Sequence, residues 1–194
     1  MNQKLVNIKM TESDNILNEA FNTSEPIEEI STLKSTMYLI FFLALPLVSG
    51  MISGYWGMSS HYKDKSEENW YNNLNRKGWY PPPWVFGPIW TAVYLFMGLA
   101  SWLIWKLPES EDRTKALKYY FMQLILNLAW TPIFFQMQMI LGALIDIFIM
   151  DGLVVLLSYM YYSLGSTWAA GLMIPYLVWL TIATYLNIKF YILN

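Results

Sequence analysis

Residues Trp84–Trp105 read WVFGPIWTAVYLFMGLASWLIW, and none of these 22 residues is charged. A helix rises about 1.5 Å per residue, so this stretch would span roughly 33 Å. The hydrocarbon core of a bilayer is about 30 Å thick, and helices buried in soluble proteins rarely stay uncharged over such a length. The stretch therefore predicts a membrane-spanning helix. Three prolines at 81–83 precede it, and the last can occupy its first turn.

Similar apolar stretches lie on both sides of this one. Met37–Met58 is uncharged, and between residues 119 and 188 only Asp146 and Asp151 carry charge. Proline and glycine positions divide the C-terminal region into three further predicted spans, Lys115–Gln136, Met139–Tyr162 and Thr167–Phe190. We therefore predict an all-α, polytopic membrane protein folded as a five-transmembrane-helix bundle. Four spans with one re-entrant segment are the alternative.

Composition supports the membrane class and excludes several functions. Hydrophobic residues make up 56% of the chain and charged residues 13%, whereas soluble domains carry about 25% charge. The net charge of −2 gives no field that would attract nucleic acid. The chain has no cysteine, which rules out disulfides, thiolate catalysis and cysteine-ligated metals.

Residues 1–35 differ from the rest, so we predict two parts: an acidic, disordered tail at 1–35 and a membrane domain at 36–194. Two lysines and six acidic residues give the segment up to residue 33 a net charge of −4. Transit peptides are rich in arginine and poor in acids, and no basic region followed by a short apolar core lies near the start. A cleavable targeting segment is therefore not expected.

The segment His61–Pro83 is predicted as a long polar loop. His61 is the only histidine, and at that place it is expected to face solvent rather than ligate haem. With five spans, seven basic residues lie on the side of the tail and five on the other side. This difference does not decide the orientation in the membrane.

Aromatic residues make up 18% of the chain and form stripes as well as an interfacial belt. Trp90, Tyr94, Met97 and Ser101 recur at helical spacing on one face of the second span. Two more stripes lie on the third and fifth spans: Asn127, Trp130 and Phe134, and then Tyr176, Trp179, Ala183 and Leu186. The stripes indicate either an aromatic cavity with few polar anchors or ordinary helix packing.

Polar groups inside the spans are few, and each is therefore informative. Gln123 and Asn127 lie four residues apart, and Asp146 lies well inside the fourth span. Asp146 is interpreted as functional, and Asn127 as a functional group or interhelical glue. Prolines 46, 88, 132 and 175 interrupt four spans, and the resulting kinks favour a cavity. Gly50 and Gly54 form a small-xxx-small pair that permits close helix contact.

Signals for an enzyme are weak. The chain shows no glycine-rich phosphate loop, no metal-ligand cluster and no nucleophile–base pair. Any chemistry would have to be a light- or oxygen-driven reaction of a bound pigment in which tryptophan takes part.

Several motifs together resemble the TspO/MBR family, the translocator proteins or peripheral-type benzodiazepine receptors. They are WYPPPWVFGPIW at 79–90, QLILN at 123–127, WTPIFF at 130–135, ALID at 143–146 and PYLVW at 175–179. The resemblance covers roughly residues 38–194. It implies five transmembrane helices and a cavity beneath the first loop that binds porphyrins, haem, sterols and isoquinoline drugs.

The resemblance also implies site residues. By position, the ligand-binding residues are Trp90, Tyr94, Asn127, Trp130, Asp146, Trp179, Ala183 and Leu186. Trp90 and Trp179 match the tryptophans implicated in porphyrin degradation by bacterial members. Two indoles can stack on a macrocycle, and Asn127 can orient a polar edge.

This chain departs from the family pattern at several positions. Gly142 stands where mammalian members have a tryptophan, and Lys118 and Met122 replace the glycines of the third-helix dimer motif. Ile188 and Ile192 replace the tyrosine and arginine of the sterol motif. A formal sterol pattern survives as Leu180…Tyr185…Lys189.

The leading hypothesis is an integral membrane protein that binds tetrapyrroles, and sterols less well, for transport, scavenging or stress sensing. The alternatives are a light- and oxygen-dependent protoporphyrin-degrading enzyme, with Trp90 and Trp179 as the reactive side chains, or a structural partner of another membrane protein. No obligatory cofactor or metal is expected; porphyrin or haem is the expected ligand. The other expected partners are the lipid bilayer and a second copy of the chain. The expected location is the outer mitochondrial membrane or endomembranes in a eukaryote, and the cell envelope in a bacterium.

Overall fold

The computed structural model describes residues 32–63 and 70–194. For residues 58–63 it describes the backbone alone. The prediction of a disordered tail at 1–35 lies outside the described part up to residue 31, but it was wrong for residues 32–35, which belong to a helix. The chain separates into two units at Ser35/Thr36, and the description below concerns Thr36–Asn194.

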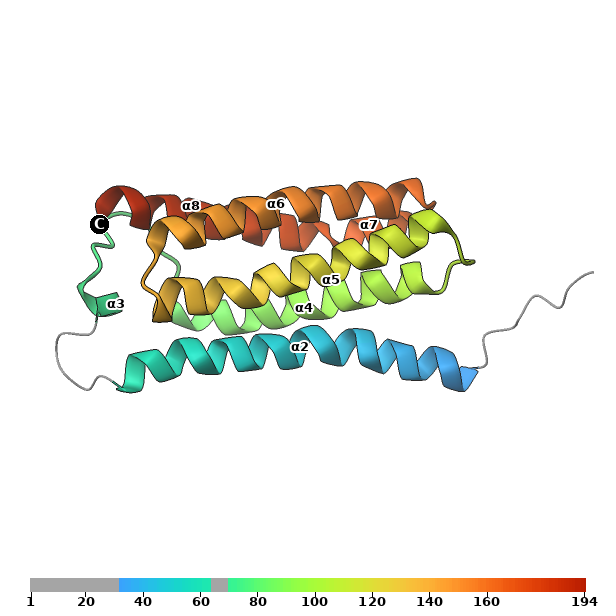
Figure 1. The fold of residues 1–194 in the computed structure, drawn as a ribbon, viewed down its shortest axis with the longest axis horizontal. Coiled ribbons are helices and arrows are strands. Elements are labelled where there is room, and N and C mark those ends of the chain that lie inside the picture. The colour runs from blue at the N-terminus through green and yellow to red at the C-terminus, as the bar shows by residue number, and fades with distance from the viewer. Residues whose placement is uncertain (1–31, 64–69) are drawn as a thin grey trace, which may run out of the picture. The chain divides into compact units, whose positions relative to one another are not determined.

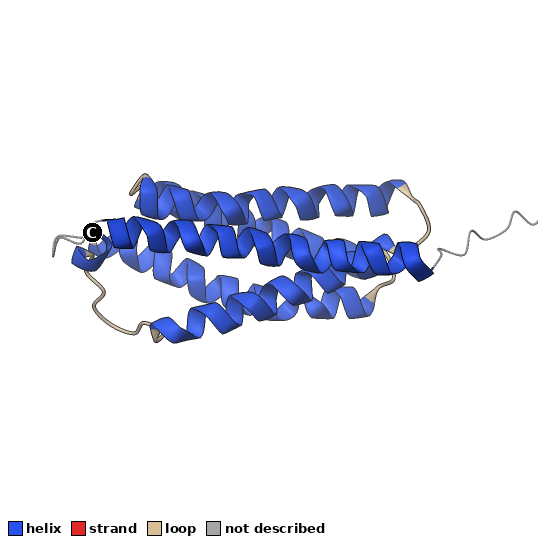
Figure 2. Ribbon diagram, turned by 90° about the horizontal axis from the view of Figure 1, so that it is seen from below, coloured by secondary structure: helices blue, strands red, loops and turns tan. Residues whose placement is uncertain are grey.

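The described residues fold into helices of different lengths and contain no strand (Figures 1 and 2). In chain order the helices are α2 (Thr32–Lys63), α3 (Trp70–Asn73), α4 (Pro83–Trp105), α5 (Glu111–Thr131), the π-helical turn η1 (Pro132–Gln136), α6 (Ile140–Ser163), α7 (Thr167–Leu172) and α8 (Ile174–Leu193). In Figure 1, α2, α4, α5, α6 and α8 run lengthwise beside one another, and α6 packs against both α5 and α8.

Four helical segments are long and apolar enough to cross a membrane: Thr32–Gly57, Pro83–Trp105, Ile140–Ser163 and Thr167–Leu193. They confirm a helical membrane bundle. The third expected span, α5 continued by η1, is equally long but begins with Glu111 and Asp112. These charges suit a helix end at the membrane surface, so a fifth span at α5 stays a prediction.

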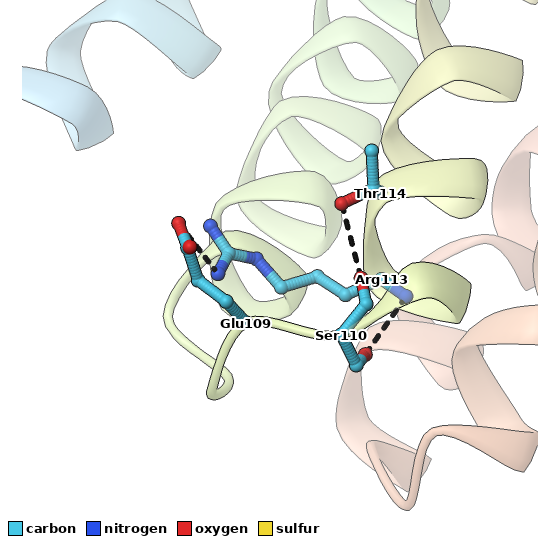
Figure 3. A network of polar contacts seen from close by, with 4 residues as sticks. All are labelled: Glu109, Ser110, Arg113 and Thr114. Atoms are coloured by element: carbon cyan, nitrogen blue, oxygen red, sulfur yellow. Dashed lines mark hydrogen bonds and ion pairs between the residues drawn. The ribbon is translucent and has the colours of Figure 1, made fainter.

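The start of α5 is stabilised by a cap outside the apolar region (Figure 3). The Ser110 side chain accepts a hydrogen bond from the Arg113 backbone N–H, and the Thr114 hydroxyl donates to the Ser110 carbonyl. Glu111 and Asp112 lie where the helix dipole favours negative charge. Arg113 pairs with Glu109 at 3.7 Å, and Glu111 pairs with Lys115. The hydrogen bond to Lys115 lowers the pKa of Glu111.

Prolines determine where helices start or change geometry. α4 begins at Pro83, as the triple proline predicts. Pro132 has no N–H to bond the Leu128 carbonyl, and from there the chain forms the π-turn η1, closed by the Met137 N–H on the Pro132 carbonyl. The predicted fifth helix is interrupted at Met173, and Pro175 lies in the first turn of α8.

A glycine terminates α6. Gly165 has φ +81°, which lets the Ser166 N–H reach the Tyr161 carbonyl and the Gly165 N–H reach the Tyr162 carbonyl. This pair of bonds is a Schellman motif, and it explains why the predicted short turn between the fourth and fifth spans is so tight.

α2 meets the bundle along one narrow stripe, buried at Phe42, Pro46, Ser49, Ser53 and Gly57. Pro46 cannot bond the Phe42 carbonyl, and Gly98 of α4 lies so close to that carbonyl that a Cβ would overlap it. Gly50 lies equally close to the Tyr94 ring. Small residues therefore let α2 approach α4, as they do in membrane helix pairs generally.

Two details of the first span differ from expectation. Gly54 is exposed and a Cβ there would meet nothing, so the small residues that make contact are Gly50 and Gly57 rather than Gly50 and Gly54. The helix also continues to Lys63, which puts His61 in α2 rather than in the loop. No proline or glycine follows Gly57 to stop the helix, which explains the extension.

Candidate functional site

Two tryptophans from different helices form the centre of the candidate site. Trp90 of α4 and Trp179 of α8 have ring centroids 6.3 Å apart and planes at 88°. Phe86, one turn before Trp90, meets Trp179 edge-on at 5.4 Å. Trp90 is half-buried and Trp179 is buried. Edge-to-face contacts of this kind hold aromatic rings at defined angles.

Two tyrosines flank Trp90. Tyr94, four residues later on α4, stacks on it with centroids 5.4 Å apart and planes at 28°. Tyr176 of α8 meets it edge-on at 6.2 Å. Trp90 therefore contacts one tyrosine of its own helix and one of α8.

The hydroxyls of both tyrosines meet at one amide. The Tyr94 hydroxyl donates to Asn127 Oδ1 at 2.9 Å, and Asn127 Nδ2 donates to the Tyr176 hydroxyl at 3.0 Å. Asn127 is buried on α5, so a single side chain joins α4 to α8 through α5. A buried amide needs such partners because unsatisfied polar groups are costly in an apolar interior.

Two further side chains complete this network. Gln123 Nε2 donates to the Tyr176 hydroxyl at 2.5 Å, and the Tyr176 hydroxyl donates to Met150 Sδ at 3.4 Å. Asn127 Nδ2 also lies 3.6 Å from Met150 Sδ. Four helices, α4, α5, α6 and α8, are thereby joined by one set of polar contacts.

Trp130 lies in a neighbouring aromatic group. Its ring stacks on Phe134 with centroids 5.0 Å apart, and its Nε1 donates to Asn187 Oδ1 at 3.2 Å. Asn187 Nδ2 in turn donates to the Ala183 carbonyl. Trp130 packs against both hydrophobic clusters of the described residues, and so links this group to the one around Trp90.

Asp146 of α6 is buried, with 6% of its surface exposed. Its Oδ2 has no hydrogen-bond partner among the described residues, which is unusual for a carboxylate in an apolar setting. Asp151, one and a half turns later, accepts a hydrogen bond from the Thr184 hydroxyl at 2.7 Å. Asp146 is thus the carboxylate with unused hydrogen-bonding capacity.

The loop before α4, residues 74–82, contacts the start of α4 and the end of α8. The Tyr80 ring is 5.8 Å from Phe86 and 6.3 Å from Phe190 of α8. Its hydroxyl lies 2.8 Å from that of Tyr71, and burial, followed by this hydrogen bond, raises its pKa. The chain of contacts from Tyr80 through Phe86 to Trp179 connects the loop to the tryptophan pair.

The end of α8 holds the same loop. The Asn75 N–H donates to Asn194 Oδ1 at 2.7 Å, and Asn194 Nδ2 returns a bond to the Asn75 carbonyl at 3.4 Å. Lys189 Nζ donates to the Trp79 carbonyl at 2.8 Å. Figure 1 shows α3 and the C-terminal end of α8 at the same end of the bundle.

The chemistry available at this site is that of aromatic surfaces with a few polar atoms. Trp179 Nε1 and Gln123 Oε1 are buried and have no partner within the described residues. The same part of the chain holds no cluster of three histidine or acidic side chains able to bind a metal. The arrangement fits a flat apolar ligand with a polar edge better than a charged metabolite.

The helices and this aromatic cluster define an integral membrane protein of the helical-bundle class. Its residues 42–193 match the sequence profile of the TspO/MBR family, and the chain belongs to that family.

Relatives come from bacteria, fungi and animals. The chain is 40% identical over 127 residues to a tryptophan-rich sensory protein of Cereibacter sphaeroides, an alignment that covers 66% of this chain and 78% of the relative. It is 40% identical over 120 residues to the translocator protein of Homo sapiens, covering 61% and 70%. It is 36% identical over 143 residues to the translocator protein homolog of Schizosaccharomyces pombe, covering 72% and 84%.

The predicted site residues fall into three groups. Trp90, Tyr94, Asn127 and Trp179 join one connected cluster. Trp130 and Ala183 are both hydrogen-bonded to Asn187, and Asp146 and Leu186 form a third group of buried side chains.

Tyr176, Gln123 and Met150 belong to the cluster but were not predicted as site residues. Spacing had already placed Tyr176 in one stripe with Trp179 and Gln123 one turn before Asn127, but neither was chosen as a ligand-binding residue. Met150 carries no such signal, because an apolar side chain in an apolar span has no distinguishing pattern.

Proposed function

We propose that this protein binds a flat tetrapyrrole, a porphyrin or haem, against Trp90 and Trp179, and that it acts in transport, scavenging or sensing of that ligand. The observation that carries the proposal is the perpendicular tryptophan pair with Tyr94 and Tyr176 beside it. Such a group offers a macrocycle both a stacking face and an edge contact. The relatives' names, translocator protein and tryptophan-rich sensory protein, support transport or sensing as the role.

Polar atoms near the pair suit the edge of such a ligand. Trp179 Nε1 is a buried donor with no partner among the described residues. Natural porphyrins also carry carboxylates, and Arg76, Lys77 and Lys189 place positive charge at the loop end of the bundle. The described residues of that end, 70–82 and 185–194, include no acidic side chain. In this proposal the carboxylates of the ligand face these three basic side chains.

A sterol fits this chain less well. In the surviving formal pattern Leu180…Tyr185…Lys189, Leu180 is fully buried, while Lys189 already bonds the Trp79 carbonyl. The three side chains therefore do not form one lipid-facing surface. The proposed ligand is therefore a tetrapyrrole rather than a sterol.

The test is an equilibrium titration of protoporphyrin IX into purified protein in nanodiscs, in the dark, followed by the absorbance of the porphyrin itself. This signal does not depend on which tryptophans remain. Trp90→Leu and Trp179→Leu are each expected to weaken binding by about tenfold, because an aromatic contact contributes about 0.5–1.5 kcal/mol beyond the buried area.

Trp168→Leu is the matched control, since Trp168 is 84% exposed at the start of α7. It should bind like the wild type. Wild-type protein that takes up no porphyrin would refute the proposal, and equal affinities in all three variants would refute the site. Repeating the titration under illumination separates binding from the degrading enzyme, which would bleach porphyrin faster than free tryptophan does.

A further inference from the structure

We propose that Tyr176 is a positioning residue that holds Trp90 at its angle to Trp179, and that Gln123 and Asn127 hold Tyr176 in turn. The effect on ligand binding rests on the function proposed above. The effect on the geometry of Trp90 does not, because it concerns the unliganded protein.

The hydroxyl of Tyr176 uses its full hydrogen-bonding capacity. A phenol has one donor and accepts at two lone pairs. Here it accepts from Gln123 Nε2 and Asn127 Nδ2 and donates to Met150 Sδ. The side chain is completely buried, so no lipid or water replaces these partners. Three bonds from two helices therefore fix the direction of the Tyr176 ring.

The Tyr176 ring is one of two α8 rings that contact Trp90. Tyr176 meets Trp90 edge-on, and Trp179, three residues along α8, meets it at a right angle. Tyr94 stacks on Trp90, and the Tyr94 hydroxyl donates a hydrogen bond to the same Asn127 amide. The half-buried indole is thus held between two tyrosines that share one anchor. If Tyr176 turned, Trp90 would lose one of these two supports.

A purely structural role is the competing reading. The same hydrogen bonds join α5, α6 and α8, so they could serve only to hold helices together. The two roles differ in what remains when the hydroxyl is lost. A positioning role changes the environment of Trp90 in a protein that is still folded, whereas a structural role lowers stability and leaves Trp90 unchanged.

The experiment compares Tyr176→Phe with Tyr120→Phe. Tyr120 is an equally buried tyrosine on α5, and its hydroxyl has no hydrogen-bond partner among the described residues. Near-ultraviolet circular dichroism of the unliganded protein isolates the Trp90 signal in each variant as its spectrum minus that of the same variant carrying Trp90→Phe. We expect Tyr176→Phe to lose intensity in this signal and Tyr120→Phe to keep it, with far-ultraviolet spectra unchanged.

Protoporphyrin IX titration gives the second readout. Tyr176→Phe removes the hydroxyl that makes all three bonds and is expected to bind protoporphyrin IX about tenfold more weakly, because Trp90 then loses a fixed support. Gln123→Leu should weaken binding similarly, and Tyr176→Phe combined with Gln123→Leu should be no weaker than either alone, because both act through the same hydroxyl.

The outcomes separate this inference from the proposed function. An unchanged Trp90 signal in folded Tyr176→Phe overturns the positioning role, whatever the porphyrin does. A changed signal with no porphyrin uptake by the wild type upholds the geometry and refutes the ligand. Should Tyr176→Phe not fold, Gln123→Leu supplies the same spectral comparison, because it leaves the tyrosine in place. Additive losses of affinity in the double variant also contradict the inference.

Discussion

The close approach of α2 and α4 gives the sharpest prediction about stability. Gly98 faces the Phe42 carbonyl, which Pro46 leaves without its helical partner. A methyl group at position 98 would overlap this oxygen, and the oxygen belongs to the backbone, so it can move only with the helix. Gly98→Ala should therefore push α2 away from α4.

The size of the effect follows from two opposing terms. Overpacking a tight contact costs about 1–3 kcal/mol, and a backbone neighbour places this case near the upper value. Alanine in a helix is favoured over glycine by about 1 kcal/mol. The net expectation for Gly98→Ala is a loss of about 2 kcal/mol in the free energy of unfolding.

Gly54→Ala is the matched control, because Gly54 lies on α2 itself and a Cβ there meets nothing. It should gain up to about 1 kcal/mol from helix propensity alone. Unfolding by a denaturing detergent, followed by far-ultraviolet circular dichroism, measures both variants. The two should differ by about 3 kcal/mol. Equal stability of Gly98→Ala and Gly54→Ala would refute the contact between α2 and the bundle.

Three further predictions concern the loop and the buried acid. The pKa of Tyr80 is raised in the folded protein, so Tyr80 stabilises the folded loop fully below its unfolded pKa of about 10, and this stabilisation is lost as pH rises through the folded pKa. Proteolysis at residues 74–82 should therefore speed up with rising alkaline pH, and Tyr80→Phe should abolish this pH dependence. Asn194→Ala removes two side-chain hydrogen bonds to Asn75 and should speed exchange of the Asn75 amide hydrogen about two- to tenfold. An unchanged exchange rate would show that these bonds do not stabilise the loop. Asp146→Asn should raise the thermal stability of unliganded protein because Oδ2 is buried without a partner, and a lower melting temperature would contradict this.

The arrangement of helices was largely predictable because it depends on long apolar stretches, which bilayer thickness makes easy to recognise. α4 and α6 begin and end within one residue of the predicted second and fourth spans. Kinks at Pro132 and Pro175 were predicted, but the π-turn at Pro132 and the start of a new helix after Met173 were not. A proline shows that one backbone bond is missing, but neighbouring helices decide whether the chain kinks, widens or starts a new helix.

The candidate site was predictable in its helix faces but not in its pairings. Spacing places Trp90 and Tyr94 on one side of α4, and it places Tyr176 beside Trp179 on α8. Whether these faces turn toward each other depends on helix rotation, which single-helix periodicity does not contain. The meeting of two tyrosine hydroxyls at Asn127 is a tertiary result of this kind.

The most direct test of the account compares two double variants by porphyrin titration. Trp90→Leu with Trp179→Leu removes the central pair, and Trp84→Leu with Trp168→Leu removes two exposed tryptophans, 76% and 84% accessible. Measured by porphyrin absorbance in the dark, the first should bind protoporphyrin IX about tenfold more weakly than the wild type or worse, and the second should match the wild type. If the two double variants bind equally well, the tryptophan pair is not the ligand site.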